Sequence, residues 1–398
     1  MSSARTVAVL GSTGSIGRQA LDVVRRNPER FEVVALAAGG GEAGLLADQA
    51  SDFGVGSVAA ADAGAGATLT QALPGVTVRA GPGAVEWAAG LGADVVLNAV
   101  TGSAGLGPTL AALGAGSTLA LANKESLVAG GALVLEARRR PDQIVPVDSE
   151  HSAIAQALRA GAPGEVRRLI LTASGGPFRG RDRADLASVT PEEALRHPTW
   201  SMGPVVTVNS ATLVNKALEV VEAHHLFGVA LEAIDVVVHP ESVVHSMVEF
   251  VDGSTVAQAS PPDMRLPIAL GLGWPDRVSD AAPACDWSEA RSWTFEPLDE
   301  EAFPAIRIVR EAVATSPLHP AVFNAANEEA VAAFLDGALP FPGILDTVEA
   351  VLADFGKGDE ARIGAALTLE AVFEAEAWAR DAARTLTGHP GTRGPAGT

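Results

Sequence analysis

The stretch VAVLGSTGSIGRQAL, residues 7–21, decides the fold of the first part of the chain. It reads as an apolar strand, a turn containing Gly11, Gly14 and Gly17, and the start of a helix. Glycines permit a tight turn and close backbone approach, and a helix N-terminus presents free N–H groups to a phosphate. The G-x-x-G-x-x-G spacing differs from the G-x-G-x-x-G of most NAD enzymes, and an ordinary glycine-rich turn would look the same. Because a second strand follows, we favour a dinucleotide-binding turn.

The segments after this turn continue the alternation of strand and helix up to about residue 150. Further apolar runs are FEVVALAAG, ADVVLNAV, STLALAN and QIVPVD, and helical stretches such as LGPTLAALGAG lie between them. This alternation is typical of a parallel, doubly wound sheet. We therefore expect an α/β protein in which residues 1–148 form a Rossmann-type, dinucleotide-binding domain.

Beyond this domain the pattern changes. Residues 149–275 combine strand-like runs with a long helical stretch, which predicts a central α+β catalytic domain, and Asp252-Gly253 is the expected turn of a hairpin. Residues 276–301 are expected to be a connector. Residues 302–387 are Ala-rich and predict a C-terminal helical bundle, and residues 388–398 are expected to form a tail.

The composition argues against several classes of partner and location. The formal net charge of −20 argues against nucleic acid or an anionic membrane, because phosphate groups bind basic surfaces. We find no apolar run of about 18 residues and no signal-peptide pattern, so no membrane partner is expected. Cys285 is the only cysteine, which leaves no intrachain disulfide and fits a cytoplasmic protein. The absence of tyrosine excludes a dehydrogenase whose general acid is Tyr.

The end of the second strand bears on the choice of cofactor. It reads ALAAGGGEAG, and an NAD site normally has an acid there for the ribose 2′-hydroxyl. No acid occurs before Glu42, so NADP is favoured. No Lys or Arg occurs there either, so backbone N–H groups of Gly39, Gly40 and Gly41 would have to hold a 2′-phosphate.

Two acids lie one residue apart in VDSEH, residues 147–151, where an apolar strand ends and a helix begins. In an extended segment, residues i and i+2 project to one side, so Asp148 and Glu150 can converge. The simpler explanation is helix capping by Ser149 or Asp148, with Glu150 in the favourable first turn, and it explains one acid better than both. Because a hard divalent cation needs several carboxylate oxygens, the pair predicts half of a metal site.

The helix NSATLVNKALEVVEAHHLFG is the expected source of a third ligand. Asn215, Lys216 and Glu219 lie three or four residues apart and can face one side. Such a face is usually a solvated helix surface, but the chain has only three lysines, which favours a functional role. We expect Ser210 to cap this helix and, with Lys216, to suit a phosphate.

Other segments carry weaker signals. Ser174 precedes a Gly-Gly-Pro break and could donate to a phosphate, although a plain turn would look the same. The loop RHPTWSMGP places Trp200 and Met202 either in a lid that excludes water or in a surface loop folded onto the core. His239 and His245 are candidate ligands, but histidines beside strands are more often buried structural residues, so we assign them a supporting role.

The order of these motifs resembles a known family. LGSTGSIG, LANKESLV, PVDSEHSAI, SGGPF, HPTWSMG, NSATLVNKALEVVEA and HPESVVHSMV together resemble the 1-deoxy-D-xylulose 5-phosphate reductoisomerase family of the methylerythritol phosphate route to isoprenoids. The resemblance covers about residues 5–385, and VDSEH with NKALE is its most specific part. It implies an NADPH-binding domain, a central catalytic domain and a four-helix bundle, assembled as a homodimer, with Mn²⁺, Mg²⁺ or Co²⁺ as the cation.

The resemblance also implies roles for individual residues. The metal ligands would be Asp148, Glu150 and Glu219. The contacts to the substrate phosphate would be Ser174, Ser210, Asn215 and Lys216, with His197 nearby. The residues that reach the carbon skeleton would be Lys124 and Ser149, and those of the lid would be Trp200 and Met202. The residues that line NADPH would be Thr13, Gly14, Ser15, Ile16, Gly39, Gly40, Gly41, Asn123, Glu125 and Gly203. The catalytic groups would be Lys124, Asp148, Glu150, His197 and Glu219.

The sequence departs from the family pattern at a few positions. Asn209, Ala217 and Glu241 stand where Asp, Gly and Gln are common, and the GGG loop lacks the basic residue that some members use for the cofactor. None of these changes removes an expected metal ligand.

The reaction that the resemblance implies has two steps. The skeleton of 1-deoxy-D-xylulose 5-phosphate rearranges, by retro-aldol cleavage or by a concerted shift, with the divalent cation as Lewis acid. The resulting 2-C-methyl-D-erythrose 4-phosphate is reduced with NADPH to 2-C-methyl-D-erythritol 4-phosphate.

Two other functions fit parts of the sequence. One is a metal-independent NADP dehydrogenase acting on another sugar phosphate, of the aspartate-semialdehyde or homoserine type, but simple hydride transfer needs no set of three carboxylates. The other is a redox sensor that binds NADP(H) without chemistry, and such a sensor would not need Lys216 and Glu219 on one helix face.

Overall fold

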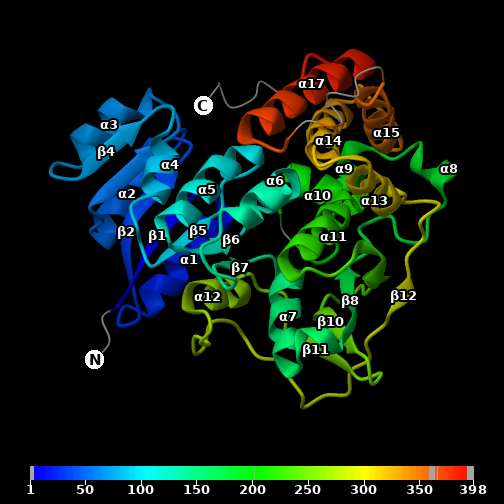
Figure 1. Cartoon of the computed structure of the whole chain (residues 1–398), viewed down its shortest axis with the longest axis horizontal. Helices are drawn as coiled ribbons and strands as arrows, with labels where there is room; N and C mark the ends of the chain where they lie inside the picture. The colour runs from blue at the N-terminus through cyan, green and yellow to red at the C-terminus, as the bar shows by residue number, and fades with distance from the viewer. Residues whose placement is uncertain (1–3, 201, 358–363, 365, 392–398) are drawn as a thin grey trace.

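The computed structural model describes residues 4–200, 202–357, 364 and 366–391, so residues 392–398 of the predicted tail lie outside the described part. The described residues form two β-sheets and a group of C-terminal helices (Figure 1). The predicted fold class, an α/β protein with a Rossmann-type sheet, a second mixed sheet and a C-terminal helical region, is confirmed. None of the described helices is long and apolar enough to cross a lipid bilayer.

The first sheet has seven parallel strands in the order β4-β3-β2-β1-β5-β6-β7. In chain order they are β1 (Arg5–Leu10), β2 (Phe31–Ala38), β3 (Ser57–Ala60), β4 (Thr77–Ala80), β5 (Val95–Asn98), β6 (Thr118–Leu121) and β7 (Ile144–Pro146). The order reverses at β1, which pairs with β2 and β5, and ligands bind at such a reversal, beside the carboxyl ends of the strands. β3 and β4 are not among the expected strands, because the Ala-rich SVAA and the half-polar TVRA show little of the continuous apolar signal of a buried strand.

Helices cover both faces of this sheet, as the alternating pattern predicts. They are α1 (Ser15–Arg26), α2 (Ala43–Phe53), α3 (Ala65–Ala72), α4 (Ala84–Ala89), α5 (Leu106–Ala115), α6 (Lys124–Glu136) and α12 (Arg265–Gly273). The face that carries Val7 packs against α1, α2 and α3, and the face that carries Ala8 packs against α4, α5 and α6. α12 follows the second sheet in the chain, but it returns to the Val7 face, where Ile268 and Leu272 are buried (Figure 1).

The second sheet has five strands in the order β11-β10-β8-β9-β12. They are β8 (Val166–Ala173), β9 (Ile234–Val238), β10 (Val244–Phe250), β11 (Thr255–Ala259) and β12 (Glu296–Pro297). β8 and β9 are parallel and the other pairs are antiparallel. The expected hairpin turn at Asp252-Gly253 is confirmed: Gly253 has a φ of +88°, and Asp252 accepts a hydrogen bond from the Ser254 N–H.

The remaining helices lie around and above this sheet (Figure 1). They are α7 (Ser149–Ala157), α8 (Arg183–Leu186), α9 (Pro191–Ala194), α10 (Pro204–Ala211), α11 (Val214–Phe227), α13 (Ala305–Thr315), α14 (His319–Leu335), α15 (Gly343–Phe355) and α17 (Leu369–Thr387). Short 3₁₀ helices occur at Ser103–Gly105, Leu158–Ala160, Pro163–Glu165 and Leu231–Ala233. α14 is buried along most of its length and packs against α15 and α17.

The predicted domain boundaries at residues 148, 275, 301 and 387 stay predictions. Two elements bear on them. α12, expected in the central domain, packs on the first sheet, and β12, which lies in the expected connector, pairs with β9.

Carboxyl groups gather where α6, α14 and α17 meet. Glu376 of α17 is 4% exposed, and its Oε1 has no hydrogen-bond partner. Burial raises the pKa of Glu376 from 4.5 to about 7, and nearby Glu328 and Glu125 act in the same direction. Burial also raises the pKa of Glu125 to about 7. The folded protein therefore keeps protons here at pH values where an unfolded chain has released them.

We expect the Glu376→Gln variant to be more stable than the wild type above neutral pH. The stability that protonated Glu376 contributes is full below pH 4.5 and is lost as the pH rises to about 7. Glutamine mimics the protonated acid, so the melting temperature should rise by roughly 2 °C at about pH 8 and stay unchanged at about pH 4. Thermal unfolding at both pH values tests this. Glu374→Gln, at an exposed position of the same helix, is the matched control. An equal gain at both pH values would contradict the explanation.

Candidate functional site

A cavity of about 760 Å³ lies where the carboxyl ends of strands in the first sheet face the second sheet and α11. Ser15 follows β1, Thr101 follows β5, Lys124 follows β6 and Asp148 follows β7, and all four line it. Ser174, after β8, lines the opposite part. The cavity therefore occupies the crevice in which ligands of doubly wound sheets bind.

Asp148 and Glu150 lie where β7 passes into α7. Asp148 is the N-cap of α7 and accepts a hydrogen bond of 3.3 Å from the Glu150 N–H. The capping explanation is therefore correct for Asp148, and Glu150 lies in the first turn rather than in an extended segment. Both carboxylates nevertheless line the cavity, so capping and convergence occur together.

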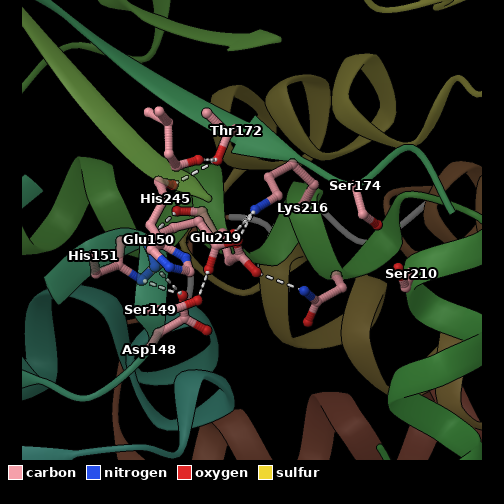
Figure 2. Close-up of polar contacts among 12 residues, drawn as sticks. Asp148, Ser149, Glu150, His151, Thr172, Ser174, Ser210, Lys216, Glu219 and His245 are labelled. Carbon is pink, nitrogen blue, oxygen red and sulfur yellow. Dashed lines mark hydrogen bonds and ion pairs between the residues drawn. The ribbon is translucent and has the colours of Figure 1, made fainter. Parts of the chain in front are cut away.

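Glu219 of α11 completes the expected set of three carboxylates. One oxygen from each of Asp148, Glu150 and Glu219 lies within 4.8 Å of the other two (Figure 2). Glu219 is 1% exposed. Because hard divalent cations bind several carboxylate oxygens at one point, the donor set fits Mg²⁺ or Mn²⁺.

Two lysines neutralise much of the charge of these carboxylates. Lys124 Nζ lies 2.8 Å from Asp148 Oδ2 and 3.2 Å from Glu219 Oε1. Lys216 Nζ lies 3.1 Å from Glu150 Oε1 and also pairs with Glu219. Asn215 accepts a hydrogen bond from Lys124 and donates one to Glu219. The predicted functional face of α11 is therefore buried against the acids and is not a solvated surface.

The buried charges shift one another's pKa values. Burial alone would raise the pKa of Asp148, but Lys124 and His151 hold it well below its usual value. Burial and then the neighbouring Glu219 raise the pKa of Glu150 to about 7. Burial would lower the pKa of Lys124, but Asp148 and Glu219 raise it well above its usual value. In the metal-free protein Glu150 therefore keeps its proton to a much higher pH than Asp148 does.

His151 links two of the helices that form the site, a role that the sequence analysis missed. Its ring is fully buried, and its Nε2 lies 2.9 Å from the backbone oxygen of Glu219. Its Nδ1 lies 3.1 Å from Glu222 and 3.4 Å from Asp148. The spacing of Asp148 and His151, three residues apart at a helix start, is the local signal that could have indicated this pairing.

A second group of polar side chains, Ser174, His197 and Ser210, lines the same cavity, and Figure 2 shows its two serines to one side of the carboxylates. His197 Nε2 lies 3.0 Å from Ser174 Oγ and 3.1 Å from Ser210 Oγ. His197 Nδ1 accepts hydrogen bonds from the backbone N–H groups of Thr199 and Trp200, so the neutral ring carries its proton on Nε2. Burial lowers the pKa of His197, which favours this neutral form. The two hydroxyls and the imidazole can together donate to an anion.

The prediction that Ser210 caps the helix of Lys216 is wrong. Ser210 lies near the end of α10, and α11 begins only at Val214. Leu213 has a φ of +62°, so it breaks the helix between the two elements, and Thr212 Oγ1 accepts a hydrogen bond from the Val214 N–H. The helical pattern of the sequence runs through this break without interruption. Leucine rarely adopts the left-handed conformation, and no Gly or Pro beside Leu213 marks the break.

The expected lid residues Trp200 and Met202 line the cavity. The Trp200 ring lies 6.3 Å from that of His245, which also lines it. His239 is buried and takes part in backbone hydrogen bonds with Val243 and Val244, a structural role as expected.

Only part of the expected cofactor set lines this cavity. The residues that do are Gly14, Ser15, Ile16 and Gly203, and those that do not are Thr13, Gly39, Gly40, Gly41, Asn123 and Glu125. The Asn123 side chain caps α6 and donates to Glu125, so it has a local structural role. Thr101, Met264 and Arg265 line the cavity without having been expected. Thr101 could have been predicted, because it follows β5 at the carboxyl edge of the first sheet. Met264 and Arg265 could not, because they lie at the start of α12, which reaches the cavity only when it returns to the first sheet.

Comparison with known proteins assigns the family. Residues 7–131 match the profile described as 1-deoxy-D-xylulose 5-phosphate reductoisomerase, and residues 144–227 match that of its C-terminal domain. Residues 259–382 match a further profile, described as the DXP reductoisomerase C-terminal domain. Together these matches cover most of the chain.

Relatives match over nearly the whole length. A 1-deoxy-D-xylulose 5-phosphate reductoisomerase of Beutenbergia cavernae is 66% identical over 388 residues, which cover 96% of this chain and 98% of that protein. The Zymomonas mobilis enzyme in complex with NADPH is 44% identical, with a TM-score of 0.88 and coverage of 96% and 99%. A DOX-P reductoisomerase in complex with NADPH, fosmidomycin and magnesium is 34% identical, with a TM-score of 0.89 and coverage of 96% and 98%. The chain therefore belongs to the 1-deoxy-D-xylulose 5-phosphate reductoisomerase family.

Proposed function

We propose that this chain converts 1-deoxy-D-xylulose 5-phosphate to 2-C-methyl-D-erythritol 4-phosphate in isoprenoid precursor biosynthesis, with NADPH and a divalent metal. The observation that carries this function is that the carboxylates of Asp148, Glu150 and Glu219 share one cavity with the glycine turn after β1. Metal and dinucleotide sites that adjoin in this way suit an isomerisation followed by a reduction. A relative's complex with NADPH, fosmidomycin and magnesium supports both cofactors.

We assign Asp148, Glu150 and Glu219 as metal ligands. A cation held there would supply Lewis-acid polarisation of substrate oxygens. Lys124 keeps a positive charge beside the same carboxylates and would contact the carbon skeleton of a substrate bound there. Ser149 donates to Glu150 at 2.6 Å and orients that carboxylate.

The group of Ser174, His197 and Ser210 is the proposed phosphate site, with Asn215 and Lys216 at its side toward the carboxylates. The neutral His197 ring presents an N–H to the anion, and its Nδ1 is held by the lid backbone. Trp200 and Met202 would exclude water from the reacting atoms. Because the phosphate lies away from the bonds that change, its binding energy orients the substrate.

The cofactor would lie along Gly14, Ser15 and Ile16, with Gly203 on the facing wall, and would supply hydride to the aldehyde. Assembly as a homodimer, use of Mn²⁺ or Co²⁺ in place of Mg²⁺, and a cytoplasmic location also belong to the proposal. They rest on the family resemblance and, for the location, on the single cysteine.

The function is tested by following NADPH oxidation with 1-deoxy-D-xylulose 5-phosphate as substrate, with and without EDTA. We expect oxidation that EDTA abolishes and that added Mg²⁺ restores. Oxidation that EDTA does not affect would indicate a metal-independent dehydrogenase, and NADPH binding without turnover would indicate a redox sensor.

Glu219→Gln should abolish metal-dependent turnover, because the cation loses one of three carboxylate ligands. The rise in melting temperature that Mg²⁺ causes in the metal-free protein should disappear with it, whereas NADPH affinity should stay unchanged. Differential scanning calorimetry and an NADPH titration measure these effects. Glu222→Gln, equally buried one turn along α11, should retain the metal-induced rise. If the two variants behaved in the opposite way, Glu222 would be the third ligand.

Ser210→Ala should raise the KM for the phosphorylated substrate about tenfold, as expected for the loss of one hydrogen bond to a charged group. The kcat should change much less, because the phosphate takes no part in the bonds that change. Steady-state kinetics measure both constants. Ser188→Ala removes an exposed hydroxyl that bonds only to a local backbone oxygen, and it should change neither. A fall in kcat at constant KM would place Ser210 outside the phosphate site.

A further inference from the structure

The loop after β2 raises a question about cofactor selection. NADPH differs from NADH by a 2′-phosphate, which carries close to two negative charges, and this protein has a net charge of −20. The loop Gly39 to Gly41 offers only backbone groups. Proteins that select NADP usually place an Arg near the end of the second strand. The sequence of this loop contains none.

The structure brings a cation to the loop from another element. Arg18 lies on α1, directly after the glycine turn, and its Nη2 lies 3.2 Å from Glu42 Oε2 and 3.3 Å from Glu42 Oε1. Its Nε donates a hydrogen bond of 2.6 Å to the backbone oxygen of Thr13. The guanidinium therefore bridges the glycine turn after β1 and the loop after β2, where the adenosine ribose lies in doubly wound sheets.

The surface beside this loop is open at two of its three glycines. A Cβ added to Gly39 or Gly41 would meet no heavy atom within 4 Å. The side chains of Arg18 and Glu42 are 54% and 57% exposed, and such exposed ion pairs are weak. Arg18 can thus exchange the Glu42 carboxylate for a phosphate with little loss, while its bond to Thr13 keeps the guanidinium in place.

We propose that Arg18 is the residue that selects NADPH over NADH, by donating to the 2′-phosphate, and that Glu42 is its partner in the cofactor-free protein. This inference rests on the proposed function, because it assumes that NADPH binds across the glycine turn. The planar guanidinium matches two phosphate oxygens at once, which a point charge does not. The alternative is that Glu42 itself accepts from the ribose 2′-hydroxyl, in which case NADH would be favoured.

The test is equilibrium binding to the full-length protein without substrate. Dissociation constants for NADPH and NADH come from cofactor fluorescence, and those for 2′,5′-ADP and 5′-ADP come from calorimetry. The variants are Arg18→Met, Arg18→Lys and Glu42→Gln. Arg25→Met is the matched control, because Arg25 lies on the same helix and makes an exposed pair of 3.4 Å with Asp52.

Arg18→Met should weaken NADPH and 2′,5′-ADP binding by about tenfold or more and leave NADH and 5′-ADP within about twofold. Arg18→Lys should retain part of the preference for NADPH over NADH. Glu42→Gln should tighten NADPH binding a few-fold, and Arg25→Met should leave all four dissociation constants unchanged. Equal weakening of NADPH and NADH by Arg18→Met would overturn the inference, as it would show only a structural role at Thr13. The inference would also be overturned if Arg18→Met kept the wild-type preference for NADPH, or if Glu42→Gln lost affinity for NADH. A wild type that binds neither cofactor would instead contradict the proposed function.

Discussion

Charge compensation around the buried Glu219 carboxylate holds the site together. A buried charge without a partner costs several kcal/mol, so groups of opposite charge from other elements must lie within ion-pair distance of it. Lys124 lies at the start of α6, directly after β6 of the first sheet, and Lys216 lies on α11 itself. Because Lys124 also contacts Asp148 at the end of β7, one set of ion pairs ties the first sheet to α11 and to the second half of the chain. A divalent cation bound among the same oxygens would strengthen this link.

Behind the charged groups, buried hydrogen bonds set the positions of the helices. His151 joins α7 to the backbone of α11. Asn209, the neighbour of Ser210 on α10, accepts a hydrogen bond of 2.9 Å from the fully buried Asn327 of α14. The C-terminal helices lie outside the cavity, but this bond joins α14 to α10, the helix that carries Ser210. Their contribution to the site is thus the support of that helix.

The two ends of the cavity use different chemistry. The carboxylate end carries opposite charges at close range, whereas the end formed by Ser174, His197 and Ser210 carries neutral donors, because burial keeps His197 unprotonated. Such neutral donors can bind an anion without placing any cation beside the carboxylates beyond Lys124 and Lys216. In a protein with a net charge of −20, anions are therefore expected to bind at local groups of donors and not at a broad basic surface.

Local residue types and spacing were enough to predict the doubly wound sheet, the hairpin at Asp252-Gly253 and the pairing of Asp148 with Glu150, because each leaves a short-range pattern. Resemblance to a family added Glu219 as the third metal ligand and His197 as a neighbour of the phosphate, because neither residue has a local pattern that indicates its role. The break at Leu213, the return of α12 to the first sheet and the placement of Arg18 beside Glu42 were decided by the tertiary structure. The last two depend on contacts between segments that are separate along the chain, and such contacts leave no periodicity in either segment alone.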